Sequence, residues 1–589
     1  MKDTIYIIYA DALQREMGSD TTLQYDLFRL IAAVQGLVNR EDPELYLFWQ
    51  EADPFWLDYM QKEGKFLHGR NRTAICDWAA FLDHYGTFIA EHGLILWDAD
   101  VPATANAAMT ACAVDGVIPV RSGSEAQRRI IAQTGAPVRI DLTGKFTGEG
   151  TVFGTDRISS GSAKCDAYLW ALENYMDRCH PTILFYTLDG IRWRSSEPYY
   201  PDLGNAFVFN MDYAVSRRAF VFDLSSYDDE TPCDDPNQPL GTDFAVMQEI
   251  LSRHYALTDG KTTTVCGFNP WQLKYTTHGG HGIHAPVEAE WHLTEVLSAY
   301  NCIKDADAFG YCGLANASVF SHFPLKSRYR NRKPKAYQTF DPAKVFDPTK
   351  TYVLFYVGDY DAAAWTARFI PQWYRDPGLG QHPLMWCFNP NLSDRIPMAY
   401  DFVYDNFTEN DYFAAGDSGA GYNNPALLYE PRPYSSLPSG VEENVRHNRE
   451  YFDRFDLDII GFVINGNHPT DERQMRDLAR FAPVGSAYNN GPQHTSVVDG
   501  AVYMPHSWDI AQQTVQTAEQ SAQAAFRGID RFPPEKRFHI FRTILVSPTR
   551  HDEILAEMKR QRPEANFELL DPYTFFALAK YAVEHGLTY

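Results

Sequence analysis

Residues 412–425 read Tyr-Phe-Ala-Ala-Gly-Asp-Ser-Gly-Ala-Gly-Tyr-Asn-Asn-Pro, a short apolar run followed at once by a glycine-rich polar segment. The run has the length and composition of a buried β-strand. The glycines after it release the backbone from ordinary dihedral limits, so the chain can pass close to a ligand while other side chains project from the loop. A buried strand that ends in such a loop is typical of parallel α/β sheets, whose functional residues follow their strands.

Similar strand-like runs recur on both sides of this segment, separated by helical stretches or long loops. Their number fits a TIM-like (β/α) barrel over residues 241–589, with an open doubly wound sheet or a seven-stranded barrel as alternatives. The expected strands are Thr263 to Phe268, Ala308 to Tyr311, Tyr352 to Val357, Leu384 to Phe388, Tyr412 to Ala415, Ile459 to Ile464, Val484 to Ala487 and His539 to Val546.

The first part of the chain also alternates strand and helix signals, so the predicted fold class is α/β throughout. We expect an N-terminal α/β region over residues 1–240, which two or three small subdomains could make up. A polar, proline-rich stretch over residues 225–241 marks its end. Expected strands are Ile5 to Tyr9, Leu45 to Trp49, Leu94 to Trp97, Val117 to Val120, Thr182 to Tyr186 and Phe220 to Leu224.

Carboxylates lie where the expected barrel strands end. Asp359 and Asp361 follow one strand and Asp417 follows another, while Glu290 lies at an expected helix start farther up the chain. Glycoside hydrolysis needs two carboxyl groups, one as the acid and one as nucleophile or base. We predict the catalytic residues among these four. Asp361 could instead cap a helix that begins near Ala362, and Glu290 could stabilise the start of its own helix.

Amide, imidazole and aromatic side chains gather after the same strands. A buried polyhydroxylated ligand needs a donor or acceptor for each hydroxyl, and aromatic rings can stack on the apolar faces of sugars. The predicted substrate-binding residues are Trp271, His281, Asn389, Gly419, Gly421, Tyr422, Asn467, His468, Tyr488 and Asn489.

Two local patterns suggest other chemistry. His278, His281 and His284 could hold a metal, but they lie on a glycine-rich loop without a ligand signature such as His-Glu-x-x-His, so no metal and no cofactor is predicted. The tetrapeptide Gly416 to Gly419 matches the nucleophile loop of trypsin-like proteases. That fold is all-β, whereas this chain reads α/β, so Ser418 is not predicted as a nucleophile.

The segment Gly419-Ala420-Gly421-Tyr422-Asn423-Asn424-Pro425 resembles the signature of the GxGYxYP family of putative glycoside hydrolases, with Asn424 in place of the second tyrosine. Further family-like segments are residues 33–40 (AVQGLVNR), 229–232 (DETP) with 241–243 (GTD), and 288–301 (EAEWHLTEVLSAYN). The resemblance therefore covers nearly the whole chain. It implies a barrel and a carbohydrate-active enzyme.

Composition narrows the range of partners. The 589-residue chain carries 76 acidic and 52 basic residues, a formal net charge of -24, which argues against nucleic acid as a partner. Its nine cysteines include no Cys-x-x-Cys pair, so neither a disulfide framework nor a structural zinc site is predicted. The short apolar run at the start reads as a strand, and no segment is long enough to span a bilayer, so we expect a cytoplasmic protein without membrane contact.

The sequence thus predicts a glycoside hydrolase that acts on an oligosaccharide or glycoside. Two alternatives remain open at this point. A non-catalytic carbohydrate-binding protein on a degenerate hydrolase scaffold would explain Asn424, and a metal-dependent deacetylase or amidohydrolase would use the three histidines with Asp359 or Asp361.

Overall fold

A computed structural model describes residues 2–187, 211–232, 234–267, 286–306, 314–334, 339–466, 468 and 470–588, with the backbone alone at 286–290 and 306. The chain divides into two compact units, which are treated separately below. Unit 1 comprises Met1–Pro324 with Pro433–Ser435, and unit 2 comprises Leu325–Arg432 with Ser436–Tyr589.

Unit 1 contains three parallel sheets with the strand orders β2-β1-β3, β5-β4-β6 and β10-β9-β7-β8. This confirms the α/β character expected of the N-terminal region. The strands are β1 Thr4–Tyr9, β2 Leu45–Phe48, β3 Asn71–Ile75, β4 Leu94–Trp97, β5 Ile118–Arg121, β6 Val138–Asp141, β7 Ile183–Tyr186, β8 Phe220–Phe222, β9 Thr263–Gly267 and β10 Cys302–Ala306.

The helices of unit 1 follow from local sequence signals. In α2 (Thr21–Val38), the Asp20 side chain accepts the Leu23 N–H at the helix start, and the residues from Leu23 to Gly36 are buried. The other helices are α1 Ala10–Met17, α3 Ala52–Met60, α4 Trp78–His92, α5 Ala103–Asp115, α6 Glu125–Thr134, α7 Ala163–Tyr175, α9 Met211–Ser216, α10 Thr242–Leu257, α12 Pro286–Ser298 and α13 Ala317–Phe320.

Unit 2 is built on one curled sheet in the order β16-β17-β15-β14-β13-β12-β11-β19-β18, with β20 also paired to β11. All of its pairings are parallel except β16 with β17. The strands are β11 Thr351–Tyr360, β12 Leu384–Phe388, β13 Asp411–Asp417, β14 Ile459–Val463, β15 Gly485–Tyr488, β16 Ser496–Val498, β17 Ala501–Pro505, β18 Trp508–Ile510, β19 Phe538–Ile544 and β20 Phe567–Leu569.

The two ends of this strand order meet in one stretch of chain. β17 pairs with β15 and β18 pairs with β19, and only His506 and Ser507 separate β17 from β18. The backbone N–H of His506 bonds to Tyr488 O at 2.9 Å, and that of Ser507 bonds to Ile540 O at 2.8 Å. Residues 501–510 therefore act as one broken strand that links β15 to β19.

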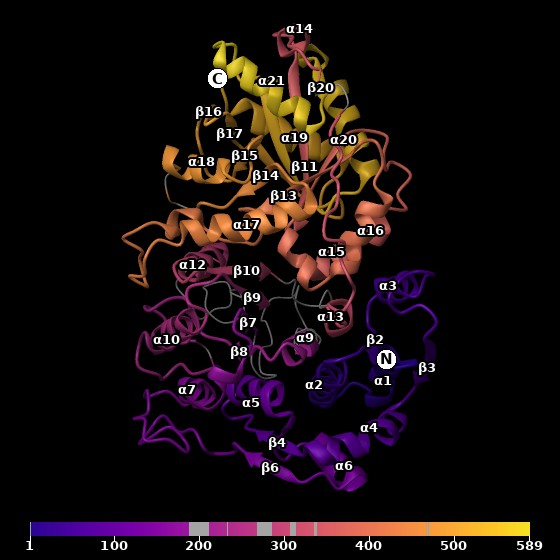
Figure 1. Ribbon diagram of the computed structural model, residues 1–589, viewed down its shortest axis with the longest axis vertical. Helices are drawn as coiled ribbons and strands as arrows, with labels where there is room; N and C mark the ends of the chain where they lie inside the picture. Colours follow the sequence, from indigo (N-terminus) through magenta and orange to yellow (C-terminus); the bar gives the residue numbers. More distant parts are fainter. Residues whose placement is uncertain are drawn as a thin grey trace. The chain divides into compact units, whose positions relative to one another are not determined.

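Helices flank these strands in Figure 1, where unit 2 runs from rose through orange to yellow. Between the sheet and α19 and α20 lies an apolar core that includes Phe355, Phe541, Ala525 and Ile554. The helices of unit 2 are α14 Pro342–Val345, α15 Ala363–Trp373, α16 Pro397–Asn406, α17 Val441–Phe455, α18 Glu472–Ala479, α19 Ala518–Asp530, α20 Pro548–Gln561 and α21 Pro572–Glu584, with 3-10 turns η5 Pro390–Asp394 and η6 Pro425–Leu428.

Two expectations need correction, and a third concerns residues outside the described part of the chain. The boundary at residue 240 falls inside unit 1, because β9, expected as the first barrel strand, pairs with β7 in the four-stranded sheet of that unit. Residues 308–311 lie outside the described part of the chain, and the strand in this region is β10, Cys302–Ala306. A TIM-like barrel is not confirmed, since the expected strand β9 belongs to unit 1 and the broken strand of residues 501–510 was missed.

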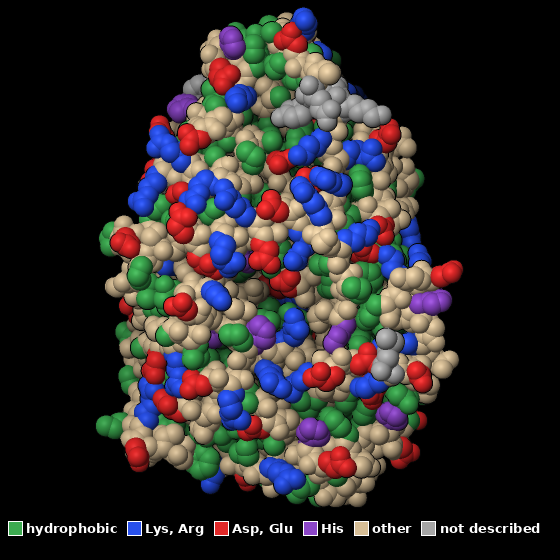
Figure 2. All heavy atoms as spheres, viewed as in Figure 1, with side chains coloured by type: hydrophobic (Ala, Val, Ile, Leu, Met, Phe, Trp, Pro, Cys, Tyr) green, Lys and Arg blue, Asp and Glu red, His purple; other side chains and the backbone are tan. Residues whose placement is uncertain are grey.

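The exposed surface carries mixed charges. Figure 2 shows Lys and Arg interspersed with Asp and Glu over the visible face, without a broad field of one sign. No described helix combines the length and hydrophobicity needed to cross a bilayer. The described cysteines are free thiols.

Candidate active site at the carboxyl ends of the strands

Asp417 is the last residue of β13 and only 4% exposed. Its carboxyl is hydrogen-bonded to that of Asp361, and Asp359 and Arg542 are also close enough to act on its charge. Burial raises the pKa of Asp417 well above its ordinary range, Asp361 and Asp359 raise it further, and Arg542 opposes them. The structure therefore brings together three of the four predicted catalytic carboxylates.

Arg542 of β19 holds the cluster together. Its Nη2 lies 2.7 Å from Asp359 Oδ1, and its Nη1 lies 3.3 Å from Asp509 Oδ2 on β18. Burial alone would lower the pKa of Arg542, but the carboxylates of Asp359 and Asp509 raise it, so the guanidinium stays charged. This ion pair favours the ionised form of Asp359.

The backbone at Asp359 departs from regular strand geometry. Its φ is +75°, in the left-handed region that non-glycine residues rarely adopt, and the pairing of β11 with β12 shifts register between Val357 and Tyr360. Strained backbone of this kind is concentrated at functional sites. Asp361 lies just beyond the strand. The following helix α15 has Ala362 at its N-cap without a side-chain cap bond, so the expected alternative role for Asp361 as its cap is not supported.

Aromatic rings pack directly next to the carboxylates. The rings of Tyr356, Phe462 and His506 lie 5.2 to 5.9 Å apart, and the Arg542 guanidinium lies 4.8 Å from the centre of the Phe462 ring. His506 Nε2 bonds to Gly461 O at 2.7 Å, and burial lowers its pKa to about 4, so the imidazole is neutral. An apolar, uncharged layer therefore borders the cluster and strengthens its electrostatic interactions.

The glycine-rich loop after Asp417 is held by helix α17. Asn448 Oδ1 accepts the Ala420 N–H at 2.7 Å, and His447 Nε2 bonds to Ala420 O at 2.7 Å. Gly419 and Gly421 have φ values of +110° and +118°, and a Cβ at Gly419 would lie 2.1 Å from Asn448 Oδ1. Gly419, which we predicted to let the backbone approach a ligand, thus lets it approach α17.

Two further loop residues are buried. Tyr422 is 4% exposed, the same fraction as Asp417, and its role as a sugar platform stays a prediction. Asn424, at the position of the second tyrosine in the signature, is 1% exposed, and its Oδ1 accepts the Ala426 N–H at 3.1 Å at the start of η6. The departure from the signature therefore supplies a helix cap within the loop.

Ser418 uses its hydroxyl in the same loop. Its Oγ donates to Asn423 O at 2.7 Å and accepts the Ile464 N–H at 3.0 Å. Both interactions are buried, and neither partner is a general base. This supports the prediction that Ser418 is not a nucleophile.

The remaining predicted binding residues have different surroundings. Asn389 directly follows β12, and its Oδ1 accepts the Asp417 N–H at 2.8 Å, which places it at the cluster. Tyr488, at the end of β15, is buried, and the groups that act on its hydroxyl are Tyr503, Tyr429 and Asp471. His468 bonds through its backbone to Asn465, and the Asn489 N–H bonds to Val463 O. These last two contacts close the ends of β14 and β15.

Several predicted residues fall outside the described part of the chain: Trp271, His281, Asn467 and the other two histidines of the proposed metal loop, His278 and His284. Glu290 lies in α12 of unit 1, where only the backbone is described. Among the described side chains, no group of three or more His, Cys, Asp and Glu residues is arranged to hold a metal.

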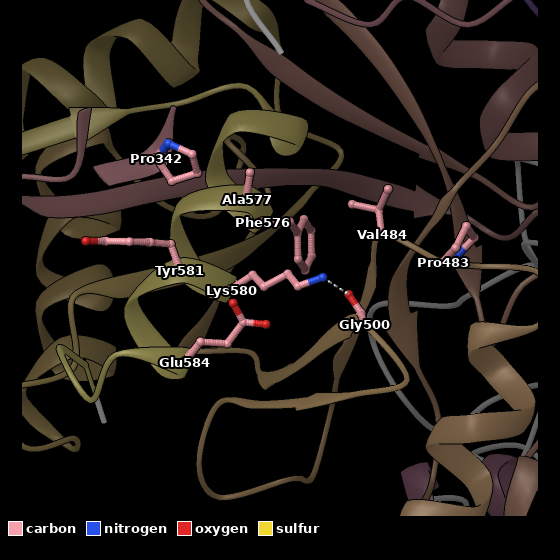
Figure 3. Close-up of a pocket in the computed structure, with 9 residues that line it drawn as sticks. All are labelled: Pro342, Pro483, Val484, Gly500, Phe576, Ala577, Lys580, Tyr581 and Glu584. Atoms are coloured by element: carbon pink, nitrogen blue, oxygen red, sulfur yellow. Dashed lines mark hydrogen bonds between the residues drawn. The ribbon is translucent and has the colours of Figure 1, made fainter. Parts of the chain in front are cut away.

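A pocket of about 350 Å³ lies in unit 2 at the amino ends of the strands, opposite to the carboxylates. Its lining includes Val484 before β15 and Gly500 before β17, and α21 contributes Phe576, Lys580 and Glu584. In Figure 3 the Lys580 side chain reaches across to the Gly500 carbonyl, 2.9 Å away, while Tyr581 points away from both. In parallel α/β folds the amino ends of the strands serve stability, so we do not assign the activity here.

Sequence reasoning missed Arg542, Asp509 and the α17 residues that hold the loop. Arg542 carried a usable signal, because it is the one Lys, Arg, Asp or Glu residue in the mostly apolar run Phe538 to Val546. A charged residue within a buried strand needs a partner. Asp509 offered no such signal, because its strand was not recognised.

Three family models match successive parts of the chain. The first domain of GxGYxYP_N matches residues 17–86, the second domain of GxGYxYP_N matches 91–179, and the GxGYxYP putative glycoside hydrolase C-terminal domain matches 349–580.

The chain belongs to the GxGYxYP family.

The fold of this GxGYxYP protein is also found in a solved structure. A crystal structure described as a putative hydrolase from Bacteroides thetaiotaomicron VPI-5482 matches with a TM-score of 0.67 and 15% identity, over 99% of this chain and 95% of the other. This likeness shows a shared fold. No curated protein matches the sequence. The cluster of Asp359, Asp361, Asp417 and Arg542 lies within the part that matches the C-terminal family domain.

Proposed function

We propose that this GxGYxYP protein is a glycoside hydrolase in which Asp417 is the general acid. The observation that carries the proposal is the burial of Asp417 against a second carboxyl, which raises its pKa and keeps it protonated where ordinary carboxyls are ionised. A protonated acid beside an ionised carboxylate is the arrangement that glycoside hydrolysis requires. The description of the matched C-terminal domain supports the same reaction class.

Asp359 is the proposed second carboxylate. Its ion pair with Arg542 favours the charged form, which a nucleophile or a water-activating base must have. Asp361 is hydrogen-bonded to Asp417, so their separation is shorter than the ~5 Å or more that a pair flanking a glycosidic bond needs. In this proposal Asp361 is a positioning residue that holds the proton on Asp417.

Asp417 and Asp359 would have different roles in the reaction. Asp417 donates its proton to the glycosidic oxygen as the bond to the anomeric carbon breaks, and Asp359 supplies electrons to that carbon directly or through a water molecule. Arg542 keeps Asp359 ionised and oriented. The proposed substrates are oligosaccharides or small glycosides.

A panel of aryl glycosides and oligosaccharides tests this function. We expect turnover of at least one substrate, and Asp417→Asn and Asp359→Asn should each lower kcat by roughly 10²-fold or more, since general acid catalysis contributes about 10²–10⁴. The matched control is Asp530→Asn, a carboxylate paired with Arg562 at the surface. Full activity in Asp417→Asn would contradict the proposal, and saturable sugar binding without turnover would identify a binding protein instead.

A further inference from the structure

The side chain of Asn389 is fixed next to the proposed acid. It is fully buried, and its Oδ1 accepts the backbone N–H of Asp417 at 2.8 Å. A Cβ at Gly416 would lie 2.1 Å from this oxygen, so the absence of a side chain there makes room for the amide. Because a backbone N–H can only be met by an acceptor, the oxygen must face Asp417 and the Nδ2 group must face the other way.

Among the residues that the structure describes, none accepts a hydrogen bond from the Nδ2 group of Asn389. A buried donor that is left unpaired destabilises the folded protein and calls for an explanation. Two other side chains on the same turn, Asn391 and Ser393, are buried and likewise have polar atoms without partners. The buried amide of Asn331 in the same unit is bonded on both sides: it donates to Phe413 O at 2.7 Å and accepts the Phe413 N–H at 3.1 Å.

We propose that Asn389 Nδ2 donates a hydrogen bond to the substrate hydroxyl next to the anomeric carbon, so that this protein takes neutral glycosides that carry this hydroxyl. The inference rests on the proposed function, because it takes Asp417 as the acid. Oδ1 and Nδ2 belong to the same planar amide, and Oδ1 accepts the Asp417 N–H. The C2 hydroxyl is the sugar hydroxyl nearest the glycosidic oxygen that Asp417 would protonate. Hydrogen bonds to this hydroxyl strengthen in the transition state of glycoside hydrolysis.

The charges around Asp417 favour a neutral sugar. Asp359, Asp361 and Arg542 lie near it, and the Arg542 guanidinium is already bonded to Asp359 and to Asp509. An anionic sugar would meet more like charges than opposite ones. An amide donor without charge, as on Asn389, suits a hydroxyl oxygen.

The test compares each aryl glycoside that is turned over with its 2-deoxy counterpart, and gives the ratio of the two kcat/KM values for every protein variant. We expect the wild-type protein to prefer the hydroxylated substrate by roughly 10²-fold or more, because a site built to bond a hydroxyl rejects analogues that lack it. Asn389→Asp keeps an oxygen for the Asp417 N–H but loses the donor, and Asn389→Ala loses both. Both should bring the ratio close to that of the uncatalysed reaction.

The ratio distinguishes loss of hydroxyl recognition from general damage to the site, because a displaced Asp417 lowers kcat/KM for the glycoside and for its 2-deoxy counterpart together. Asn331→Ala is the control for loss of a buried amide and should keep the wild-type ratio. A wild-type ratio near that of the uncatalysed reaction overturns the inference without any variant, and an unchanged ratio in a folded Asn389→Asp protein does so too. In both cases hydrolysis itself would stand. Absence of wild-type turnover on the whole panel would reject the hydrolase proposal and this inference with it.

Discussion

Arg542 Nη2 lies 2.7 Å from Asp359 Oδ1, and the same guanidinium packs on the ring of Phe462. The arginine therefore fixes the position of Asp359 and favours its ionised form at once. Both effects depend on the planar fork of a guanidinium, which can bond to two carboxylates while stacking on a ring.

Arg542→Lys should lower kcat/KM by roughly 10-fold or more, because an ammonium keeps the charge but neither bridges Asp359 and Asp509 nor stacks on Phe462. Arg542→Met should lower it further, since it leaves Asp359 beside Asp417 without a cation. Steady-state kinetics on the best aryl glycoside measure the order. Arg562→Lys is the control, because its pair with Asp530 is solvent-exposed and exposed ion pairs contribute little. Equal activity in all three variants would contradict the role of Arg542.

The pH dependence of kcat/KM should reflect the raised pKa of Asp417. A general acid works while protonated, so activity should persist above the ordinary range of carboxyls and fall as the pH rises through the pKa of Asp417. Asp361→Asn removes a neighbouring carboxylate that raises this pKa, so the alkaline limb should move to lower pH. A limb that stays in place in an active Asp361→Asn protein would show that Asp361 does not set the proton on Asp417.

The sequence predicted the strands of unit 2 well where they are apolar and end in polar loops. Leu384 to Phe388 was predicted with its exact ends, and the strand before Asp417 was found although it extends to Asp417 itself. The strand of residues 501–510 was missed because His506 and Ser507 interrupt its apolar pattern. Without it, neither the ends of the sheet nor the neighbours of Arg542 could be inferred.

The candidate site was partly predictable because its residues follow strands that were recognised in the sequence. Parallel strands bring their carboxyl ends to one edge, so Asp359, Asp361, Asn389 and Asp417 could be grouped from strand order alone. The direction in which a side chain points could not be predicted from strand order, because a register shift changes the face of the sheet that the side chain occupies. Tyr488 ends its strand as expected, yet its hydroxyl lies by Tyr429 and Asp471. The glycines of the loop were recognised, but a partner on a distant helix such as Asn448 leaves no local signal.

Asn424 should matter for stability and not for turnover. Asn424→Ala removes the cap on η6 and should cost about 1 kcal/mol of unfolding free energy, while Asn424→Asp keeps the acceptor and should cost less. Asn424→Tyr places the residue of the family signature into a site that is 1% exposed here, and overpacking of this kind typically costs about 1–3 kcal/mol. Denaturant unfolding measures these differences. A changed substrate preference in a stable Asn424→Tyr protein would show that this position contacts the ligand.

The hydroxyl of Ser418 should contribute to stability and not to catalysis. Both Ser418→Ala and Ser418→Gly lose the hydroxyl that bonds to Asn423 O and the Ile464 N–H, which should cost roughly 1–3 kcal/mol of unfolding free energy. The backbone of Ser418 has a φ of +56°, which glycine adopts freely and alanine does not, so the glycine variant should be more stable than the alanine variant by about 1 kcal/mol. If the serine were a nucleophile, both variants would lose activity equally and serine-directed reagents would inactivate the wild-type protein. We expect both folded variants to retain turnover, because the serine serves to tie the end of β14 to the loop beside Asp417.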